Sequence, residues 1–216
     1  MGSEMCIRDR TEIERKYDVD QTAVVPDLGG VAGGGLVVER TEPRPAVELV
    51  ATYWDTDDHA LVAARTTLRR REGGGDEGWH LKLPPQAGTT GRREVHWPLG
   101  SADEPVPADL LALVAGVLDG RSVRPVLRLA TNRSVLMLLA DDDSALAEVA
   151  DDVVTATRLA SGAERRWREW EVELAPGVDG EPGEGLLDAV EQRVLAAGAV
   201  VSSSRSKLAR GLGAEG

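Results

Sequence analysis

Three charged residues near the start of the chain alternate along a segment whose pattern is typical of a β-strand. In Thr-Glu-Ile-Glu-Arg-Lys-Tyr-Asp-Val, residues 11–19, the side chains of Glu12, Glu14 and Lys16 are spaced two apart. Successive side chains of a strand point to opposite faces, so these three share one face. A half-buried strand normally turns such a face to water. The pattern gains weight because later strands repeat it.

Five later segments also alternate charged and apolar side chains: 64–72, 78–83, 91–99, 145–157 and 164–174. The middle segments carry mainly Arg and Lys, whereas the first strand and the last two long ones carry mainly carboxylates. The cations that share the charged faces are Lys16, Arg69, Arg71, Lys82 and Arg92, with Arg133 and Lys207 less clearly in phase; the acids are Glu12, Glu14, Glu94, Glu148, Asp152, Glu169, Glu171 and Glu173.

So many charges cannot be buried without partners, because their desolvation would exceed the net stability of a domain, about 5–15 kcal/mol. They must face water, one another or a charged ligand. Arg and Lys suit phosphate oxygens, and clustered carboxylates suit a hard divalent cation such as Mg²⁺. The two sets together indicate a site for a polyphosphate and a metal ion. The plainer alternative is an ion-paired interior that holds no ligand.

Several short motifs, taken in order, resemble the CYTH domain of the triphosphate tunnel metalloenzyme superfamily. The first is Glu12-Ile13-Glu14-Arg15-Lys16, and the resemblance extends from Thr11 to Leu212. Each motif is weak alone, but their order and spacing are specific, and they are closest to those of bacterial inorganic triphosphatases. The other motifs are Trp54-Asp55-Thr56, Leu68-Arg69-Arg70-Arg71, His80-Leu81-Lys82-Leu83-Pro84, Arg92-Arg93-Glu94, Glu148 to Asp152, Glu169 to Glu173, and Ser206-Lys207-Leu208.

This resemblance implies an α+β, mainly β fold: an eight-stranded antiparallel β tunnel, closed as a barrel, with covering helices. It also implies a bound triphosphate and Mg²⁺ or Mn²⁺, with Lys16 at the reacting end. The implied phosphate-binding residues are Arg69, Arg71, Lys82, Arg92, Arg133 and Lys207, and the implied metal ligands are Glu12, Glu14, Asp152, Glu169, Glu171 and Glu173. Arg128 and Arg133 are five apart, so a regular strand cannot turn both inward without a bulge; Arg133 is preferred.

Two segments have helical spacing of apolar residues, 107–118 and 186–197. In a barrel whose outer face is apolar, these helices can cover it. Trp79, Trp97 and Trp170 are out of phase with the charges and are expected to pack beneath them. Only Trp167 shares the phase of the carboxylates.

Composition excludes several other classes. The net charge of −12 opposes non-specific nucleic-acid binding, and no apolar run is long enough to cross a membrane. Cys6 is the only cysteine, so the chain forms no internal disulfide and no thiolate metal cluster. A cytoplasmic location is expected, and the sequence is compatible with a homodimer. No G-x-x-x-x-G-K-[ST] motif occurs, and the three histidines are scattered.

Residues 1–10 show no periodicity and are expected to be a disordered leader, followed by one domain over 11–212 and a tail over 213–216. Three functions fit this domain. The first is hydrolysis of inorganic triphosphate. The second is an organic-triphosphate enzyme: an adenylate cyclase, a thiamine triphosphatase or a nucleoside triphosphatase. The third is a non-catalytic polyphosphate-binding module. Because an organic ring usually needs an aromatic stacking partner, the scarcity of in-phase aromatics favours the first.

Overall fold

The computed structural model describes residues 8–85, 91–101 and 104–213. Over these residues the chain forms thirteen strands and five helices. The strands are β1 (Arg8–Glu12), β2 (Glu14–Asp18), β3 (Ala32–Gly33), β4 (Leu36–Val37), β5 (Arg40–Pro43), β6 (Val47–Asp55), β7 (Thr67–Glu72), β8 (Gly78–Lys82), β9 (Arg92–Trp97), β10 (Arg124–Leu139), β11 (Ala145–Arg158), β12 (Glu164–Leu174) and β13 (Val200–Val201). The helices are α1 (Ala60–Ala63), α2 (Ala108–Leu113), α3 (Ala115–Leu118), α4 (Gly180–Ala196) and α5 (Lys207–Leu212).

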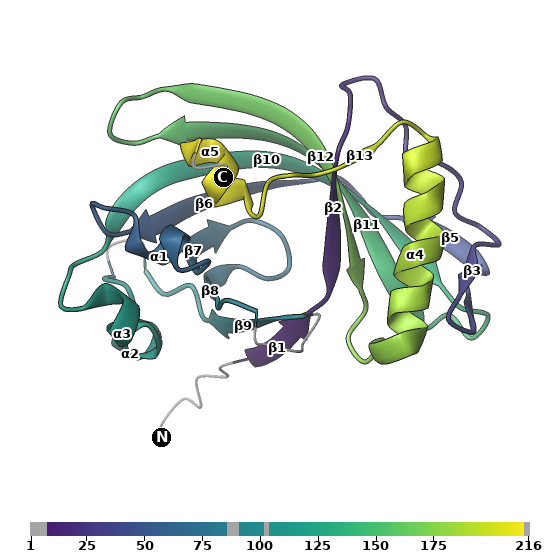
Figure 1. Ribbon diagram of the computed structural model, residues 1–216, viewed down its shortest axis with the longest axis horizontal. Coiled ribbons are helices and arrows are strands. Elements are labelled where there is room, and N and C mark those ends of the chain that lie inside the picture. The colour runs from purple at the N-terminus through teal and green to yellow at the C-terminus, as the bar shows by residue number, and fades with distance from the viewer. Residues whose placement is uncertain (1–7, 86–90, 102–103, 214–216) are drawn as a thin grey trace.

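Eleven of the strands form one antiparallel sheet, in the order β1-β9-β8-β7-β6-β10-β11-β12-β2-β13, with β5 paired to β10. The sheet curls strongly, so that β2 faces the strands β6 to β9 (Figure 1). Only Ile13 separates β1, which pairs with β9, from β2, which pairs with β12. The prediction of a mainly β, antiparallel α+β domain is confirmed. The eight-stranded closed barrel is not: the sheet has more strands and forms a half-barrel.

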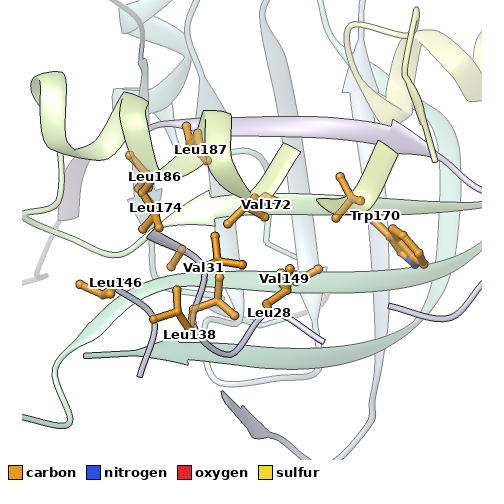
Figure 2. Close-up of a cluster of buried hydrophobic side chains, with 14 of the residues drawn as sticks. Leu28, Val31, Leu138, Leu146, Val149, Trp170, Val172, Leu174, Leu186 and Leu187 are labelled. Carbon is orange, nitrogen blue, oxygen red and sulfur yellow. The ribbon is translucent and has the colours of Figure 1, made fainter. Parts of the chain in front are cut away.

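Helix α4 covers one part of the convex face of the sheet. Leu186 and Leu187 on the helix pack against Val172 and Leu174 of β12 (Figure 2). The predicted helix over 186–197 starts earlier, at Gly180, because Pro182 lies in the first helical turn, where its missing N–H has no partner to lose. Trp170 belongs to the same cluster, as predicted.

A second part of the convex face lies under α2 and α3, on the opposite side of the molecule from α4 (Figure 1). Trp79 and Trp97 pack there with Leu110, Val114 and Leu118. The prediction that the two helical segments cover the apolar outer face is therefore confirmed.

The concave face is not charged throughout, which the sequence patterns did not predict. Trp167, in phase with the carboxylates, packs with Tyr53, Leu127 and Leu129 and with Leu208 of α5. This apolar cluster fills one end of the interior. The charged side chains are confined to the remaining part.

Strand β1 begins at Arg8, three residues before the expected domain start at residue 11, and pairs with β9 from there. Backbone pairing to His96 and Val95 places Arg8 and Asp9 in the sheet although their sequence shows no strand periodicity. The rest of the predicted leader, residues 1–7, and the tail residues 214–216 lie outside the described residues. Within the described part, no helix has the length and apolar character needed to cross a membrane.

Candidate active site

A cavity of about 430 Å³, here the first cavity, opens on the charged part of the concave face. Its wall combines side chains from β1, β2, β6, β7, β8, β9, β10, β11, β12 and the start of α5. Eleven of the thirteen predicted site residues line it: Glu12, Glu14, Lys16, Arg69, Arg71, Lys82, Arg92, Arg133, Glu171, Glu173 and Lys207.

Strands β7, β8 and β9 supply one cationic wall. They follow one another as antiparallel neighbours, so Lys82 lies opposite Thr67 on one side and opposite Glu94 on the other. The turn between β7 and β8 needs a left-handed backbone at Gly73 and Gly74, which have φ values of 87° and 79°. Arg69 and Arg71 alternate along β7 and face the cavity together.

The break at Ile13 places Glu12 and Glu14 on separate strands, yet both line the first cavity. Lys82 joins them: its Nζ contacts Glu12 Oε2 closely and lies 3.6 Å from Glu14 Oε1. The prediction that the Glu-x-Glu-x-Lys face points to a common site agrees with this placement. The sequence pattern predicted one regular strand for these residues, whereas in the structure Glu12 and Glu14 lie on two strands that meet at Ile13.

Glu171 is the meeting point of three cations. Its Oε1 accepts hydrogen bonds from Lys207 Nζ at 2.6 Å and, at closer range, from Lys16 Nζ. Its Oε2 accepts from Arg133 Nη2 at 2.9 Å. The β12–β2 register explains the contact with Lys16, since Glu171 lies directly opposite that residue.

Asp152 and Glu169 lie beneath this layer and do not line the first cavity. Carboxylate oxygens of Asp152, Glu169 and Glu171 lie within 4.8 Å of one another. Lys207 Nζ lies among them, 3.0 Å from Asp152 Oδ2 and 2.6 Å from Glu169 Oε1. Arg133 also forms a bidentate pair with Asp152, at 2.8 and 2.6 Å. The two deeper acids therefore hold the cations that face the cavity.

The ionisation of Lys16 and Glu14 follows from this pairing. Burial opposes the charge of Lys16, but the carboxylates of Glu14 and Glu171 outweigh it and raise the pKa of the amine. Burial likewise opposes the charge of Glu14, but Lys16 and Lys82 lower its pKa to about 2. The raised pKa favours the ammonium form of Lys16 over the free base.

Glu173 has a different environment. It lies opposite Glu14 in the β12–β2 register, and burial together with the charges of Glu12 and Glu14 raises its pKa to about 7. Within the described residues it has no ion-pair partner. Glu12 Oε2, although close to Lys82, accepts no hydrogen bond of normal geometry. Carboxylate oxygens that receive no hydrogen bond from the protein, such as Glu12 Oε2, are hard ligands of the kind that Mg²⁺ and Mn²⁺ bind.

Three residues that contact the site were not among the predicted site residues. Asp76, in the turn after β7, forms a close ion pair with Arg71 and lines the cavity. Glu94 lies 3.7 Å from Arg69 and 3.2 Å from His80 Nδ1. Arg10, assigned to the leader, lines the cavity and lies 3.0 Å from Glu94. Glu94 was recognised as an inward acid; a turn residue such as Asp76 carries no periodic signal.

Other expectations can be compared with the same structure. Arg133 faces the cavity and Arg128 is exposed, in agreement with the preference stated above. His80 Nε2 contacts Asp76 O at 2.9 Å, and His96 Nε2 contacts Glu77 O at 3.0 Å. Among the described residues, the acid groups that could gather around a metal ion include no histidine.

The family model of the CYTH domain matches residues 10–212 of this chain. Uncharacterized proteins of two Mycobacterium tuberculosis strains, CDC 1551 / Oshkosh and ATCC 25618 / H37Rv, are each 43% identical over 213 residues. The alignments cover 94% of this chain and 40% of each relative, so the chain spans well under half of their length. A thiamine-triphosphatase of Macaca fascicularis is 36% identical over 104 residues, 43% of this chain and 44% of that protein.

Two solved structures share the fold at low sequence identity. One is a putative adenylate cyclase from Bacillus halodurans, with a TM-score of 0.58, 18% identity, and coverage of 94% of this chain and 97% of that one. The other is a putative adenylyl cyclase from Hippeastrum whose structure is described as revealing a dominant triphosphatase activity. It has a TM-score of 0.52, 15% identity, and coverage of 95% and 96%.

Proposed function

Because the chain belongs to the CYTH domain family, we propose that it hydrolyses inorganic triphosphate in the first cavity with the help of a divalent metal ion. The observation that carries the proposal is that one cavity is lined by both cationic and carboxylate side chains. Arg69, Arg71 and Arg133 present guanidinium groups to the same cavity as the carboxylates of Glu12, Glu14 and Glu173. An anion that itself carries a cation fits such a division.

The cationic side chains hold the phosphate oxygens. Arg guanidinium groups bind phosphate oxygens in pairs, and Lys groups act as point charges. Arg133 and Lys207 are pre-positioned by Asp152 and Glu171, which fix their direction before the substrate arrives. Fixed donors of this kind stabilise the charge that develops during phosphoryl transfer without reorganising.

Glu12, Glu14, Glu171 and Glu173 would hold the metal ion, Mg²⁺ or Mn²⁺, with Asp152 and Glu169 behind them. A bound divalent ion would supply neutralisation of charge on the phosphate oxygens. Support for this assignment comes from Glu173, which lies opposite Glu14 and whose pKa is raised by burial and by the charges of Glu12 and Glu14.

The reaction is direct attack by water. The water oxygen forms a bond to the terminal phosphorus, the bridging P–O bond breaks, and pyrophosphate leaves with both electrons of that bond. The water gives up a proton to a carboxylate of the acidic wall. Lys16, held as an ammonium group, orients the water or stabilises charge. In the described lining of the first cavity, Ser206 is the one Ser, Cys or His residue. Its hydroxyl accepts from Ala209 N at 3.1 Å and has no base beside it, so this lining offers no activated protein nucleophile.

The lining favours an inorganic substrate over an organic one. Among the described residues, Tyr53 is the only aromatic side chain in the wall, and its ring belongs to the apolar cluster. Trp167, the one tryptophan in phase with the carboxylates, is buried and donates to Glu169 Oε2 at 2.5 Å. A thiamine or adenine ring therefore finds no exposed stacking platform among the described residues of this cavity.

A phosphate-release panel tests the proposal. Inorganic triphosphate, ATP, thiamine triphosphate and a long polyphosphate are compared with Mg²⁺ and with Mn²⁺. The expected result is the highest kcat/KM for inorganic triphosphate. A higher value for ATP or thiamine triphosphate would favour the organic-triphosphate alternative. Tight binding without phosphate release under any condition would favour a non-catalytic module.

A further inference from the structure

A second cavity of about 470 Å³ adjoins the first. It lies between α1, the segment that follows α1, and the chain that leads into α5. Four residues line both cavities: Thr67, Arg92, Arg205 and Ser206. The two spaces are therefore neighbours across a shared wall, with Arg92 at the junction.

The cations of the two cavities differ in their pairing. In the first cavity Lys16, Lys82 and Arg133 each contact one or more carboxylates. In the second, Arg65 and Arg205 have no carboxylate partner anywhere in the part of the chain that the structure describes. Arg92 donates to backbone carbonyls, at 2.7 Å to Arg65 O and 3.2 Å to Leu83 O.

None of these three arginines forms an ion pair within the described residues. Burial is the largest influence and lowers the pKa of Arg92; the charge of Glu14 acts against it, as do those of Glu12 and Glu94, while the Arg65 guanidinium lowers the pKa further. Asp58, the one acid in the described lining, is paired with Arg121 at 2.5 Å. In a chain of net charge −12, three arginines that share a cavity without an acid partner are a place for an anion.

The backbone around this cavity is strained. His59 and Arg65 adopt left-handed conformations, with φ values of 59° and 57°, and both line the second cavity. Such conformations cost free energy in residues other than glycine, and they concentrate where a site needs them. His59 Nδ1 is buried without a hydrogen-bond partner among the described residues. A ligand oxygen in the cavity would supply one.

We infer that the second cavity receives the additional phosphates of a linear polyphosphate whose reacting end lies in the first cavity. The inference rests on the proposed function, since it extends the same substrate past Arg92 to Arg65 and Arg205. Inorganic chains of four or more phosphates would then be held more tightly than triphosphate. An organic group is disfavoured because the described lining has three arginines and, apart from His59, no ring on which a base could stack.

Binding of chains of increasing length tests this directly. Inorganic triphosphate, tetraphosphate and a longer linear polyphosphate are titrated by calorimetry in Ca²⁺, with phosphate release followed in parallel to verify that turnover is suppressed. Wild type is compared with Arg65→Asn, because Arg65 lines the second cavity and not the first. Asn tolerates the left-handed conformation of residue 65, so the fold should be retained. Arg166→Gln on β12, an exposed arginine distant in sequence, controls for the general loss of positive charge.

Wild type should bind tetraphosphate about tenfold more tightly than triphosphate, as one charge-assisted contact predicts. Arg65→Asn should lose most of this preference and keep its triphosphate affinity, whereas Arg166→Gln should keep both. Equal affinities of wild type for all lengths, or an equal loss for every length in Arg65→Asn, would overturn the inference.

Failure of the proposed function is recognised separately. It would appear as absent triphosphate hydrolysis with Mg²⁺ and Mn²⁺, whatever the dependence of binding on chain length. A normal rate with triphosphate and no preference for tetraphosphate would reject only the second cavity as a phosphate site.

Discussion

The carboxylate of Glu171 lies between three cations, Lys16, Lys207 and Arg133. Burial opposes its charge, but the three attractive contacts outweigh that cost and hold its pKa well below the usual range. Removing this one negative charge leaves three cations facing one another. The residue therefore has two roles, one in the proposed metal site and one in holding the cationic wall together.

Glu171→Gln tests both roles. Metal-dependent phosphate release should fall about tenfold to a hundredfold, since an amide is a poor ligand and no longer orients Lys16. The free energy of unfolding without ligand should fall by about 1.5–3 kcal/mol, because Lys16, Lys207 and Arg133 each lose a charge-assisted contact and keep only their other carboxylate partners. Steady-state kinetics and urea denaturation measure the two effects.

The matched control is Glu164→Gln, an exposed carboxylate at the start of the same strand. It should change neither quantity. Triphosphate supplies negative charge to the same three cations, so it should restore part of the stability that Glu171→Gln loses. A Glu171→Gln variant with wild-type rate at limiting Mg²⁺ would exclude Glu171 as a metal ligand.

At the residue scale, much of the site could be predicted from alternation alone. A charged side chain every second residue needs no tertiary information to be assigned to one face, as Arg69 and Arg71 show. The alternation cannot separate a cavity wall from a deeper layer. Asp152 and Glu169 have the same phase as Glu171 but lie beneath it, because cations from other elements cover them.

Helix α1 depends on a single buried carboxylate. Asp55 Oδ1 accepts hydrogen bonds from the backbone N–H groups of Thr56 and Leu61 at 2.7 and 2.8 Å, and Oδ2 accepts from Val62 N at 3.1 Å. The motif Trp54-Asp55-Thr56 therefore has a structural explanation. It anchors the segment that carries His59 and Arg65.

Asp55→Ala should lower the free energy of unfolding by about 2 kcal/mol or more, because buried N–H groups lose their acceptor. Triphosphate hydrolysis at low temperature should stay close to wild type, since Asp55 lines neither cavity. Thermal denaturation and kcat measured well below the transition separate the two effects. A large fall in kcat with an unchanged transition would assign Asp55 a role in the reaction.

Tyr17 joins β2 to α4. Its ring is buried, and its hydroxyl donates to Glu191 Oε2 at 2.9 Å. Burial and, second, Glu191 raise the pKa of the phenol above its ordinary value. The folded state therefore favours the protonated form. The resulting stability is fully present below the unfolded pKa of about 10 and is lost as pH rises towards the folded pKa.

Wild type should consequently lose stability more steeply than Tyr17→Phe as the pH rises from about 8 to about 11. At the lower pH the variant should be less stable by about 1 kcal/mol, the usual value of one hydrogen bond. Denaturant unfolding of both proteins at the two pH values measures this, and ionisation of lysines cancels in the comparison. Parallel pH dependences would show that Tyr17 ionises equally in both states.

At the element scale, the long amphipathic segments were predictable and the short ones were not. Strand β12 and the later part of α4 are recognisable from their period. Helix α5 is not, because six residues are too few for a periodic signal, yet Lys207 and Leu208 complete the charged and apolar parts of the interior. The break at Ile13 depends on pairing with two strands far along the chain.

Across the whole molecule, the first cavity concentrates charges that a bound ligand would neutralise. Triphosphate with Ca²⁺ at about a hundred times Kd should stabilise the folded state by about 2.7 kcal/mol and raise Tm by about 5–10 °C. Chelation of the metal should remove most of this shift. Thermal denaturation with triphosphate, with orthophosphate and with chelator provides the comparison. Equal shifts for orthophosphate and triphosphate would contradict binding along the cavity.

The whole-molecule arrangement could be predicted only in outline. Antiparallel succession and the covering helices follow from local patterns and short connections. The extent of closure does not, because it depends on how far the sheet curls. The apolar inner cluster around Trp167 was missed for a similar reason: Val154 and Ala156 share the phase of the acids, and only the position of α5 shows that they are packed.

The pairing of β1 with β9 and of β2 with β12 has a consequence for biosynthesis. Strands β1 and β2 are synthesised before their hydrogen-bond partners, residues 92–97 and 164–174. Lys207, which compensates Asp152 and Glu169, follows later still. At about 5–20 residues per second, the unpaired strands and acids wait several seconds for them. During translation, the nascent chain thus exposes strand edges that a ribosome-associated chaperone can shield.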